Sequence, residues 1–251
     1  WTQVEGCDLV GVVDSSAERR QQVIDQYGGA GHAEVDALIE AGVDVVTIAT
    51  PTVHHRAAAE KLLAAGVHCL IEKPLAPTPA EARAIADAAA KSGAMLQVGH
   101  VVRYDPVMVA VRKLGLVPRF VEVDRVSPMT FRSVDVGVVL DMMIHDLDVV
   151  MAFVKSPVVS VEAVGIPVLS RSEDIANARL QFADGCVANL SASRMSLKKA
   201  REIRIFQEDA YLSLDFMNQA GHLVKRDDLV AHAVRVRAGD LKGGEAVPVR
   251  E

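Results

Sequence analysis

The sequence predicts an α/β fold in two parts: a doubly wound parallel sheet over residues 1–102, and an α/β domain with a mainly antiparallel, open sheet over residues 103–251. Two patterns lead to this prediction. In the first hundred residues, short β-branched runs alternate with helical segments of roughly 10–15 residues, as in βαβ units. Beyond residue 119, segments with period-2 alternation follow one another with little helix between them, as in an antiparallel sheet.

Turn and cap residues mark the elements of the first part. A strand at 9–13 stops at Asp14, and Ser15 and Ser16 are N-cap candidates for a helix that runs to about Tyr27. The same reasoning gives the remaining elements of this part: a short helix at 35–41, strands at 43–49, 67–71 and 94–98, a helix at 53–65 that ends before Gly66, and a helix at 79–92 between Thr78-Pro79 and Gly93.

The second part opens with a helix at 104–114 and a strand at 119–127, and a long helix at 137–154 follows. Asp184-Gly185 has the composition of a hairpin turn. The strands expected around this turn and beyond it are 158–168, 174–183, 186–194, 201–208 and 210–216. Residues 225–251 are polar and poorly periodic, and we expect only weak structure there.

Composition excludes several functional classes. The net charge is −6 and the basic residues are scattered, which argues against a nucleic-acid partner. No apolar stretch approaches the roughly 20 residues that span a bilayer, and the N-terminus lacks the order of a signal peptide, so we expect no membrane partner and a cytoplasmic location. Cys7, Cys69 and Cys186 are too few and too far apart for a disulfide framework or a CxxC metal site. We expect three buried thiols and no metal.

The segment Glu72-Lys73-Pro74 follows an apolar run that indicates a buried parallel strand. Ligand sites in open α/β sheets lie just beyond the carboxyl ends of such strands, so an acid and a base here are candidates for chemistry. Both residue types are rarely buried without a partner. The alternative is a surface loop in which Glu72 and Lys73 are solvated.

Asp141 and His145 lie four residues apart in a helix whose other residues are mostly apolar. An acid and an imidazole are costly to bury in such a run unless they meet partners or water in a cleft. Histidine is also the side chain best suited to proton transfer near neutral pH. The alternative is a histidine that is satisfied within the core.

A dinucleotide-binding sheet needs a first strand that runs into GxGxxG, and neither precedes the strand at 9–13. The glycine cluster at 28–31 follows a helix, so we interpret it as a loop. Either the motif lies upstream of the sequence shown or cofactor binding is lost. Asp14 sits where such folds place the acid that binds the adenosine ribose, which favours NAD over NADP. A helix cap is the alternative for Asp14.

In combination, these motifs resemble a known family. The chain is similar to the Gfo/Idh/MocA family of NAD(P)-dependent oxidoreductases from about residue 8 to residue 216. The resemblance rests on Ile48-Ala49-Thr50-Pro51-Thr52, His55, Glu72-Lys73-Pro74-Leu75, Val98-Gly99-His100 with Arg103, and Asp141-x-x-x-His145.

The resemblance implies an N-terminal Rossmann domain, a C-terminal domain that binds substrate, and a homo-oligomer formed through the C-terminal sheet. It implies that Lys73 and His145 flank the substrate carbinol with the help of Asp141, and that the Lys73-Pro74 bond is cis. For NAD binding it implies the set Asp14, Thr50, Pro51, His55, Glu72 and His100.

The chemistry expected of such a site is the oxidation of a sugar alcohol. This reaction needs a base, a cation near the developing oxyanion and a C–H bond aimed at the nicotinamide. His145, oriented by Asp141, is the expected base, and Lys73 is the expected cation and possible proton relay.

Arginines are the substrate-binding candidates, because a guanidinium binds a phosphate or carboxylate with two hydrogen bonds. These candidates are Arg103, Arg125 and Arg132. Residues 173–179 and 189–194 resemble family members that oxidise nucleotide sugars, the UDP-N-acetylglucosamine 3-dehydrogenases. The alternatives are a free sugar or inositol dehydrogenase, an NAD-assisted glycosidase and a non-catalytic NAD-binding protein.

Overall fold

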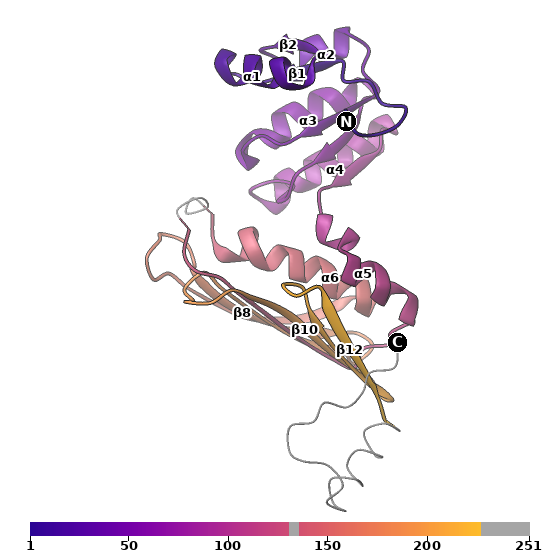
Figure 1. Ribbon diagram of the computed structural model, residues 1–251, viewed down its shortest axis with the longest axis vertical. Helices are drawn as coiled ribbons and strands as arrows, with labels where there is room; N and C mark the ends of the chain where they lie inside the picture. The colour runs from indigo at the N-terminus through magenta and orange to yellow at the C-terminus, as the bar shows by residue number, and fades with distance from the viewer. Residues whose placement is uncertain (131–135, 227–251) are drawn as a thin grey trace, which may run out of the picture. The chain divides into compact units, whose positions relative to one another are not determined.

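Backbone contacts divide the chain into two units, Trp1–His100 and Val101–Glu251, called here unit 1 and unit 2. The computed structural model describes residues 1–130 and 136–226. Each unit has its own hydrophobic core: one formed around α3, α4 and β4, the other between the large sheet and the helices on one of its faces (Figure 1).

Unit 1 consists of short parallel strands separated by helices. Its strands form two sheets, β1-β2 and β3-β4-β5. A doubly wound order has one more strand between β1 and β3, and the described residues ahead of β1 contain no strand. The elements are β1 (Gly11–Val13), α1 (Ala17–Tyr27), β2 (Ala30–His32), α2 (Asp36–Glu40), β3 (Val45–Ile48), η1 (Thr52–His54), α3 (His55–Ala64), β4 (His68–Ile71), α4 (Pro79–Ser92) and β5 (Leu96–Val98).

Local sequence explains where these helices begin and end. Ser16 caps α1 by accepting from the N–H of Arg19, and Thr78 caps α4 by accepting from that of Glu81. Gly93 ends α4 in the left-handed conformation at φ 75°, which an L side chain rarely adopts. The cap residues expected from the sequence are therefore confirmed.

The glycine cluster after α1 was predicted to be a loop, which holds for Gly28 and Gly29 but is wrong for Ala30 and Gly31. Ala30–His32 forms β2, which pairs in parallel with β1. The pairing is possible because Gly31 lies against α1, where an added Cβ would be 2.4 Å from Cδ1 of Ile24. Glycine here serves a close helix–strand approach and not a turn.

Unit 2 is a seven-stranded sheet with helices on one face, in the order β12-β11-β10-β6-β9-β8-β7 (Figure 1). All neighbours are antiparallel except β6 and β9, which run parallel. The elements are η2 (Val101–Tyr104), α5 (Pro106–Val111), η3 (Arg112–Leu114), β6 (Phe120–Val126), the π-helix η4 (Val139–Met143), α6 (Ile144–Val154), β7 (Val158–Ile166), β8 (Ile175–Phe182), β9 (Val187–Ser193), β10 (Ala200–Phe206), β11 (Ala210–Asp215) and β12 (Ala220–Lys225).

Three sequence predictions for unit 2 need correction. The expected helix at 104–114 is split into η2, α5 and η3, because Asp105 caps a new start with Pro106 at the first position. The expected continuous helix at 137–154 begins as a π-helix. β12 was not predicted, since its residues show no clear alternation. The Asp184-Gly185 hairpin is confirmed, with Gly185 at φ 88° between β8 and β9.

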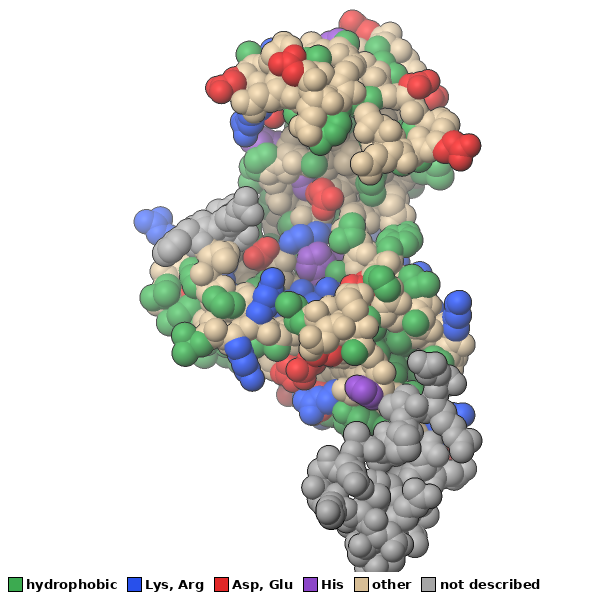
Figure 2. Space-filling view, viewed as in Figure 1, with side chains coloured by type: hydrophobic (Ala, Val, Ile, Leu, Met, Phe, Trp, Pro, Cys, Tyr) green, Lys and Arg blue, Asp and Glu red, His purple; other side chains and the backbone are tan. Residues whose placement is uncertain are grey.

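Cysteines and surface charges complete the description. Cys69 and Cys186 are buried, whereas Cys7 is only partly buried, which corrects the expectation of three buried thiols. Basic side chains are scattered over the visible surface of each unit (Figure 2). Among the described helices, none combines the length and apolar character that a bilayer crossing requires.

Candidate active site

In unit 1, predicted site residues follow three neighbouring strands. Thr50 and Pro51 come after β3, Glu72 and Lys73 after β4, and His100 after β5. Because β3, β4 and β5 are parallel, these residues lie at one edge of the sheet. This is the edge at which open α/β sheets bind ligands.

The loop that carries Lys73 is fixed by backbone contacts. The N–H of Glu72 donates to the carbonyl of Ile48 at 2.9 Å, and the N–H of Lys73 donates to Oε2 of Glu72 at 3.3 Å. An added Cβ at Gly99 would lie 2.9 Å from Oε2 of Glu72, so a glycine is needed beside this carboxylate. The Lys73-Pro74 bond is cis, as the resemblance implied.

His55 links the ends of β3 and β4. It is 1% exposed, with Nε2 2.8 Å from the carbonyl oxygen of Thr50 and Nδ1 3.1 Å from that of Pro74. Carbonyl oxygens only accept, so a neutral ring bonds one of them and an imidazolium bonds both. The ring therefore supports the loop on both sides, and its direct contact with a cofactor stays a prediction.

Asp14 follows β1 and uses one carboxylate oxygen locally. Its Oδ1 accepts from the N–H of Ser16 at 2.7 Å, and Nε of Arg19 lies 3.7 Å from the same atom. The N-cap of α1 is Ser16 and not Asp14, so the cap that the sequence offered as an alternative for Asp14 is not confirmed. Asp14 holds the cap residue through Oδ1, and no hydrogen bond to its Oδ2 is found among the described residues.

In unit 2, Asp141 lies in the π-helix η4 and His145 in the first turn of α6. π-turns within helices occur frequently at functional sites. The carboxylate and carbonyl of Glu173 satisfy the start of this helix, because Oε1 accepts from the N–H of Val139 at 3.2 Å and the carbonyl accepts from that of Val138 at 2.8 Å.

A buried ion pair supports Glu173 from the next residue. Nε of Arg194 donates to Oδ1 of Asp174 at 2.7 Å, with side-chain exposures of 4% and 0%. The N–H of Ser170, followed by other backbone donors of residues 168–170 and by Arg194, holds the pKa of Asp174 far below its usual value. Nη1 of Arg194 also donates to the carbonyl of Val136, so the network reaches the chain just before η4.

Two of the predicted substrate arginines are engaged by acids of α6. Arg125 contacts both carboxylate oxygens of Asp146 at 2.6 Å, and Arg103 contacts both of Asp148 at 2.5 and 2.7 Å. These pairs fix the helix that carries His145, and substrate contact by either arginine stays a prediction. Arg132 lies outside the described residues.

A cavity of about 520 Å³ lies within unit 2 between the helix and strands β7 and β8. Its walls are mostly apolar and include Val139, Met143 and Leu147. Neither Asp141 nor His145 lines it. Within the described ranges, no group of three or more His, Cys, Asp or Glu side chains is arranged to hold a metal ion.

Comparison with family models agrees with the arrangement of both units. Residues 1–100 match the oxidoreductase family model with the NAD-binding Rossmann fold, and residues 120–213 match the GFO/IDH/MocA C-terminal domain. The chain belongs to the Gfo/Idh/MocA oxidoreductase family. The predicted family, fold class and NAD cofactor type are thereby confirmed.

Three relatives illustrate the range of the family. The UDP-N-acetylglucosamine 3-dehydrogenase of Acidithiobacillus ferrooxidans is 41% identical over 87% of this chain and 70% of its own length. A solved structure of that enzyme has a TM-score of 0.82, with 37% identity over 92% of this chain and 82% of its own. The scyllo-inositol 2-dehydrogenase (NAD(+)) of Bacillus subtilis is 27% identical over 78% of this chain and 62% of its own. The WlbA dehydrogenase of Bordetella pertussis, solved with NADH and UDP-GlcNAcA, shares the fold with a TM-score of 0.79 at 20% identity, over 85% of this chain and 68% of its own.

The described residues of unit 1 fit the family's cofactor. Asp14 offers a carboxylate oxygen where a ribose hydroxyl can donate, and the β3–β5 edge offers a glycine-lined surface next to Glu72. When NAD is bound, its nicotinamide supplies the hydride acceptor. Asp14 and the residues that follow β3, β4 and β5 are the ones that would hold it.

The sequence did not predict the residues that support the helix carrying His145. Asp146 and Asp148 were visible in the motif as acids inside an apolar helix, and their need for partners could have led to Arg125 and Arg103. Glu173 gave no such signal, since a single acid in a loop is usually solvated.

Proposed function

We propose that this protein is an NAD-dependent dehydrogenase that oxidises a secondary alcohol on the sugar of a nucleotide sugar. UDP-N-acetylglucosamine is the first candidate substrate, with its C3 hydroxyl as the reacting group. The observation that carries the proposal is the similarity to the Acidithiobacillus ferrooxidans enzyme, whose name states that activity and whose sequence is 41% identical over most of this chain.

In this proposal, residues of both units take part in removing the proton from the alcohol. The ammonium group of Lys73 stabilises the oxyanion that develops when the alcohol loses its proton. The imidazole of His145 accepts that proton, and Asp141, one helical turn earlier, stabilises the imidazolium. General-base assistance of this kind is worth about 10²–10⁴ in rate.

Rigid support favours this assignment. The loop that carries Lys73 is held by backbone hydrogen bonds, and His145 lies on a helix tied to the sheet by the buried Asp146–Arg125 pair. Catalytic groups need fixed positions, because misplacement by an ångström can cost about 100-fold in rate.

An inositol dehydrogenase is the second candidate. The Bacillus subtilis relative favours it, at lower identity. An inositol carries no phosphate, so this reading gives the arginines of unit 2 no oxyanion to bind. Location and assembly are also part of the proposal: we expect a cytoplasmic enzyme in which the sheet face opposite α6 pairs with a second copy.

The test is the appearance of NADH absorbance with the full-length protein, NAD and separate samples of UDP-N-acetylglucosamine, other UDP-sugars, free sugars and inositols. We expect a signal with a UDP-sugar that disappears in Lys73→Met. A signal with inositols alone would replace the proposal by the second candidate. NAD binding without turnover of any compound would favour the glycosidase or the non-catalytic alternative.

A further inference from the structure

Arg201 and Arg125 are opposed on neighbouring strands of unit 2. They are register partners of β10 and β6, and they lie on the same face of the sheet as Ile203 and Val123, which are buried in the core. Opposed Cβ atoms in such a pair are about 4.5–5.5 Å apart, and like charges at this distance repel. Two arginines at this position need two acceptors.

Among the described residues, only Arg125 of the two has a hydrogen-bond acceptor. Arg125 uses its Nε and Nη2 atoms on the carboxylate of Asp146, and Arg103 uses the same two atoms on that of Asp148. In Arg201, Nε and Nη2 are buried and have no hydrogen-bond partner within the residues that the structure describes. The Nε and Nη2 atoms that bind a carboxylate in Arg103 and Arg125 therefore bind no described group in Arg201.

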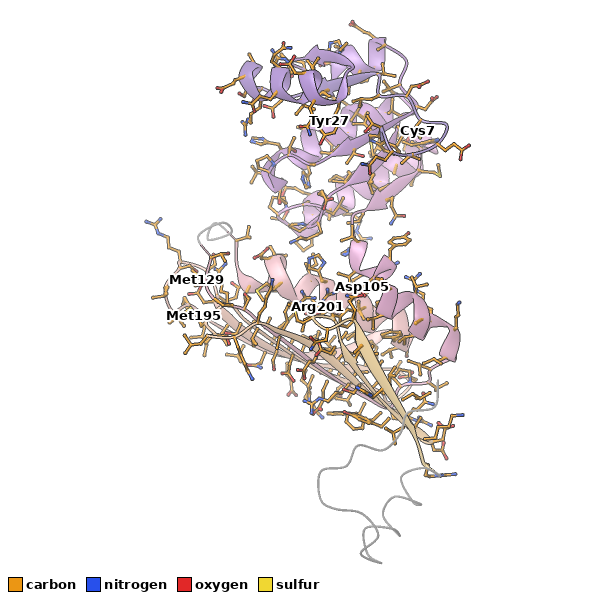
Figure 3. All side chains as sticks on the ribbon, in the orientation of Figure 1. Cys7, Tyr27, Asp105, Met129, Met195 and Arg201 are labelled. Atoms are coloured by element: carbon orange, nitrogen blue, oxygen red, sulfur yellow. The ribbon has the colours of Figure 1, made fainter. Side chains whose placement is uncertain are left out.

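The acids near Arg201 are engaged elsewhere. Asp146 has both oxygens occupied, while Asp105 caps α5 through Oδ1 and accepts from Nε2 of Gln219 through Oδ2. Figure 3 labels Arg201 and Asp105 next to each other, and the charge of Asp105 acts on that of Arg201. The direct neighbour of the guanidinium is Phe216, whose ring centroid lies 4.3 Å from Cζ.

Arg201 still carries its charge at neutral pH. Burial, followed by repulsion from Arg125, lowers its pKa to about 10, and Asp146 and Asp105 oppose the shift. A buried cation without an acceptor loses its hydration and gains little in return, and native proteins rarely keep such a group without a functional reason.

We propose that the Nε–Nη2 edge of Arg201 binds an oxyanion of the substrate. This inference rests on the proposed function, in which the oxyanion is a diphosphate oxygen of the nucleotide sugar. The planar guanidinium matches two oxygens of a phosphate or a carboxylate. Arg201 as a whole residue is only partly buried, and the proposal requires that its terminal torsions rotate to turn this edge toward the ligand.

The first experiment measures thermal stability with NAD present, with and without inorganic pyrophosphate, UDP or glucuronate. The variants are Arg201→Met and Arg201→Lys, and the control is Arg204→Met on the same strand, whose side chain is 39% exposed and pairs with Glu122 and Asp124. Without probe, Arg201→Met should melt at or above the wild-type temperature, because a buried unpaired charge is removed. With probe, wild type and Arg204→Met should be stabilised and Arg201→Met should not.

The second experiment separates binding from chemistry. In Arg201→Met the Kd of UDP and the KM of the nucleotide sugar should rise about 10–100-fold, the loss expected for a charge-assisted hydrogen bond, while kcat changes by less than about threefold. Arg201→Lys should recover only part of the affinity, since it keeps the charge and loses the fork.

Different failures can be told apart. A lower melting temperature of Arg201→Met without probe, together with equal UDP binding by variant and wild type, would overturn the inference and make Arg201 structural. If no nucleotide sugar is oxidised but pyrophosphate or UDP binding still depends on Arg201, the oxyanion site stands and the proposed substrate fails. A response to glucuronate alone supports the site and identifies its ligand as a carboxylate.

Discussion

The Lys73 loop of unit 1 and the His145 helix of unit 2 are held by different kinds of interaction. The loop that carries Lys73 is held by backbone hydrogen bonds and by the contacts of His55 with carbonyl oxygens. Beside it, Gly99 leaves the space that the carboxylate of Glu72 occupies. Around His145 the contacts are ion pairs between buried acids and arginines. The stability of the first region should therefore depend mainly on side-chain volume, and that of the second on the charges of its side chains.

Lys73→Met tests this contrast with the largest expected effect. In the proposed function the ammonium group of Lys73 stabilises the developing oxyanion. We expect kcat to fall about 10²–10⁴-fold while the melting temperature stays close to that of the wild type. Lys61→Met is the matched control, because the side chain of Lys61 is 51% exposed and pairs with Asp36 at the surface. A large loss of stability in Lys73→Met would show that charge also supports unit 1.

Asp146→Asn is the corresponding change in unit 2. The substitution removes the charge that compensates Arg125, which is only 13% exposed. Breaking such a buried pair costs about 3–5 kcal/mol, which corresponds to a decrease in melting temperature on the order of 10 °C. Thermal unfolding measures it, with Asp36→Asn on the surface of unit 1 as control. Equal melting temperatures for the two variants would contradict a charge-based support of α6.

The contrast also separates what the sequence predicts from what it does not. Motifs in unit 1 are local: a strand ends, a glycine or proline follows, and the next helix begins at a cap such as Thr78. These signals placed most helices and the edge that carries Lys73. They failed at Gly31, whose role depends on Ile24 of the preceding helix and not on its own neighbours.

In unit 2 the decisive contacts are distant in sequence. Arg125 and Asp146 are 21 residues apart, Arg103 and Asp148 are 45 apart, and Glu173 reaches Val139 across 34 residues. The period-2 pattern predicted the strands but not which partners face each other across them. The sequence does not single out Arg201 for this reason, because its role depends on its register partner Arg125 and on the acids near the two guanidinium groups.

Gly137 offers a smaller test, because it shows that volume can matter in unit 2 as well. An added Cβ would lie 1.9 Å from Oε1 of Glu173, the group that caps the catalytic helix. We expect Gly137→Ala to lower stability by about 1–3 kcal/mol and to lower kcat, because the cap is displaced.

A double-mutant cycle isolates that contact. In the Glu173→Ala background the clash disappears, so Gly137→Ala should cost clearly less than it does in the wild type. Additive effects of the two substitutions would mean that the glycine is needed for its backbone and not for the space beside Glu173.

The smallest expected effect concerns a property that both units share. Burial raises the pKa of the Cys69 thiol in unit 1 and that of the Cys186 thiol in unit 2 to about 11. Only the thiolate reacts with a disulfide reagent, so at pH 8 about one part in a thousand of each group is reactive even before access is considered.

Cys7 is partly exposed and should react first. We expect one fast thiol and two slow ones, with the slow rates rising as pH increases toward 11. Cys7→Ser should remove the fast phase alone. If Cys186 reacts quickly while Cys69 does not, then the core of the charge-supported unit opens more readily than that of the shape-supported one, and the contrast extends from the sites to the cores beneath them.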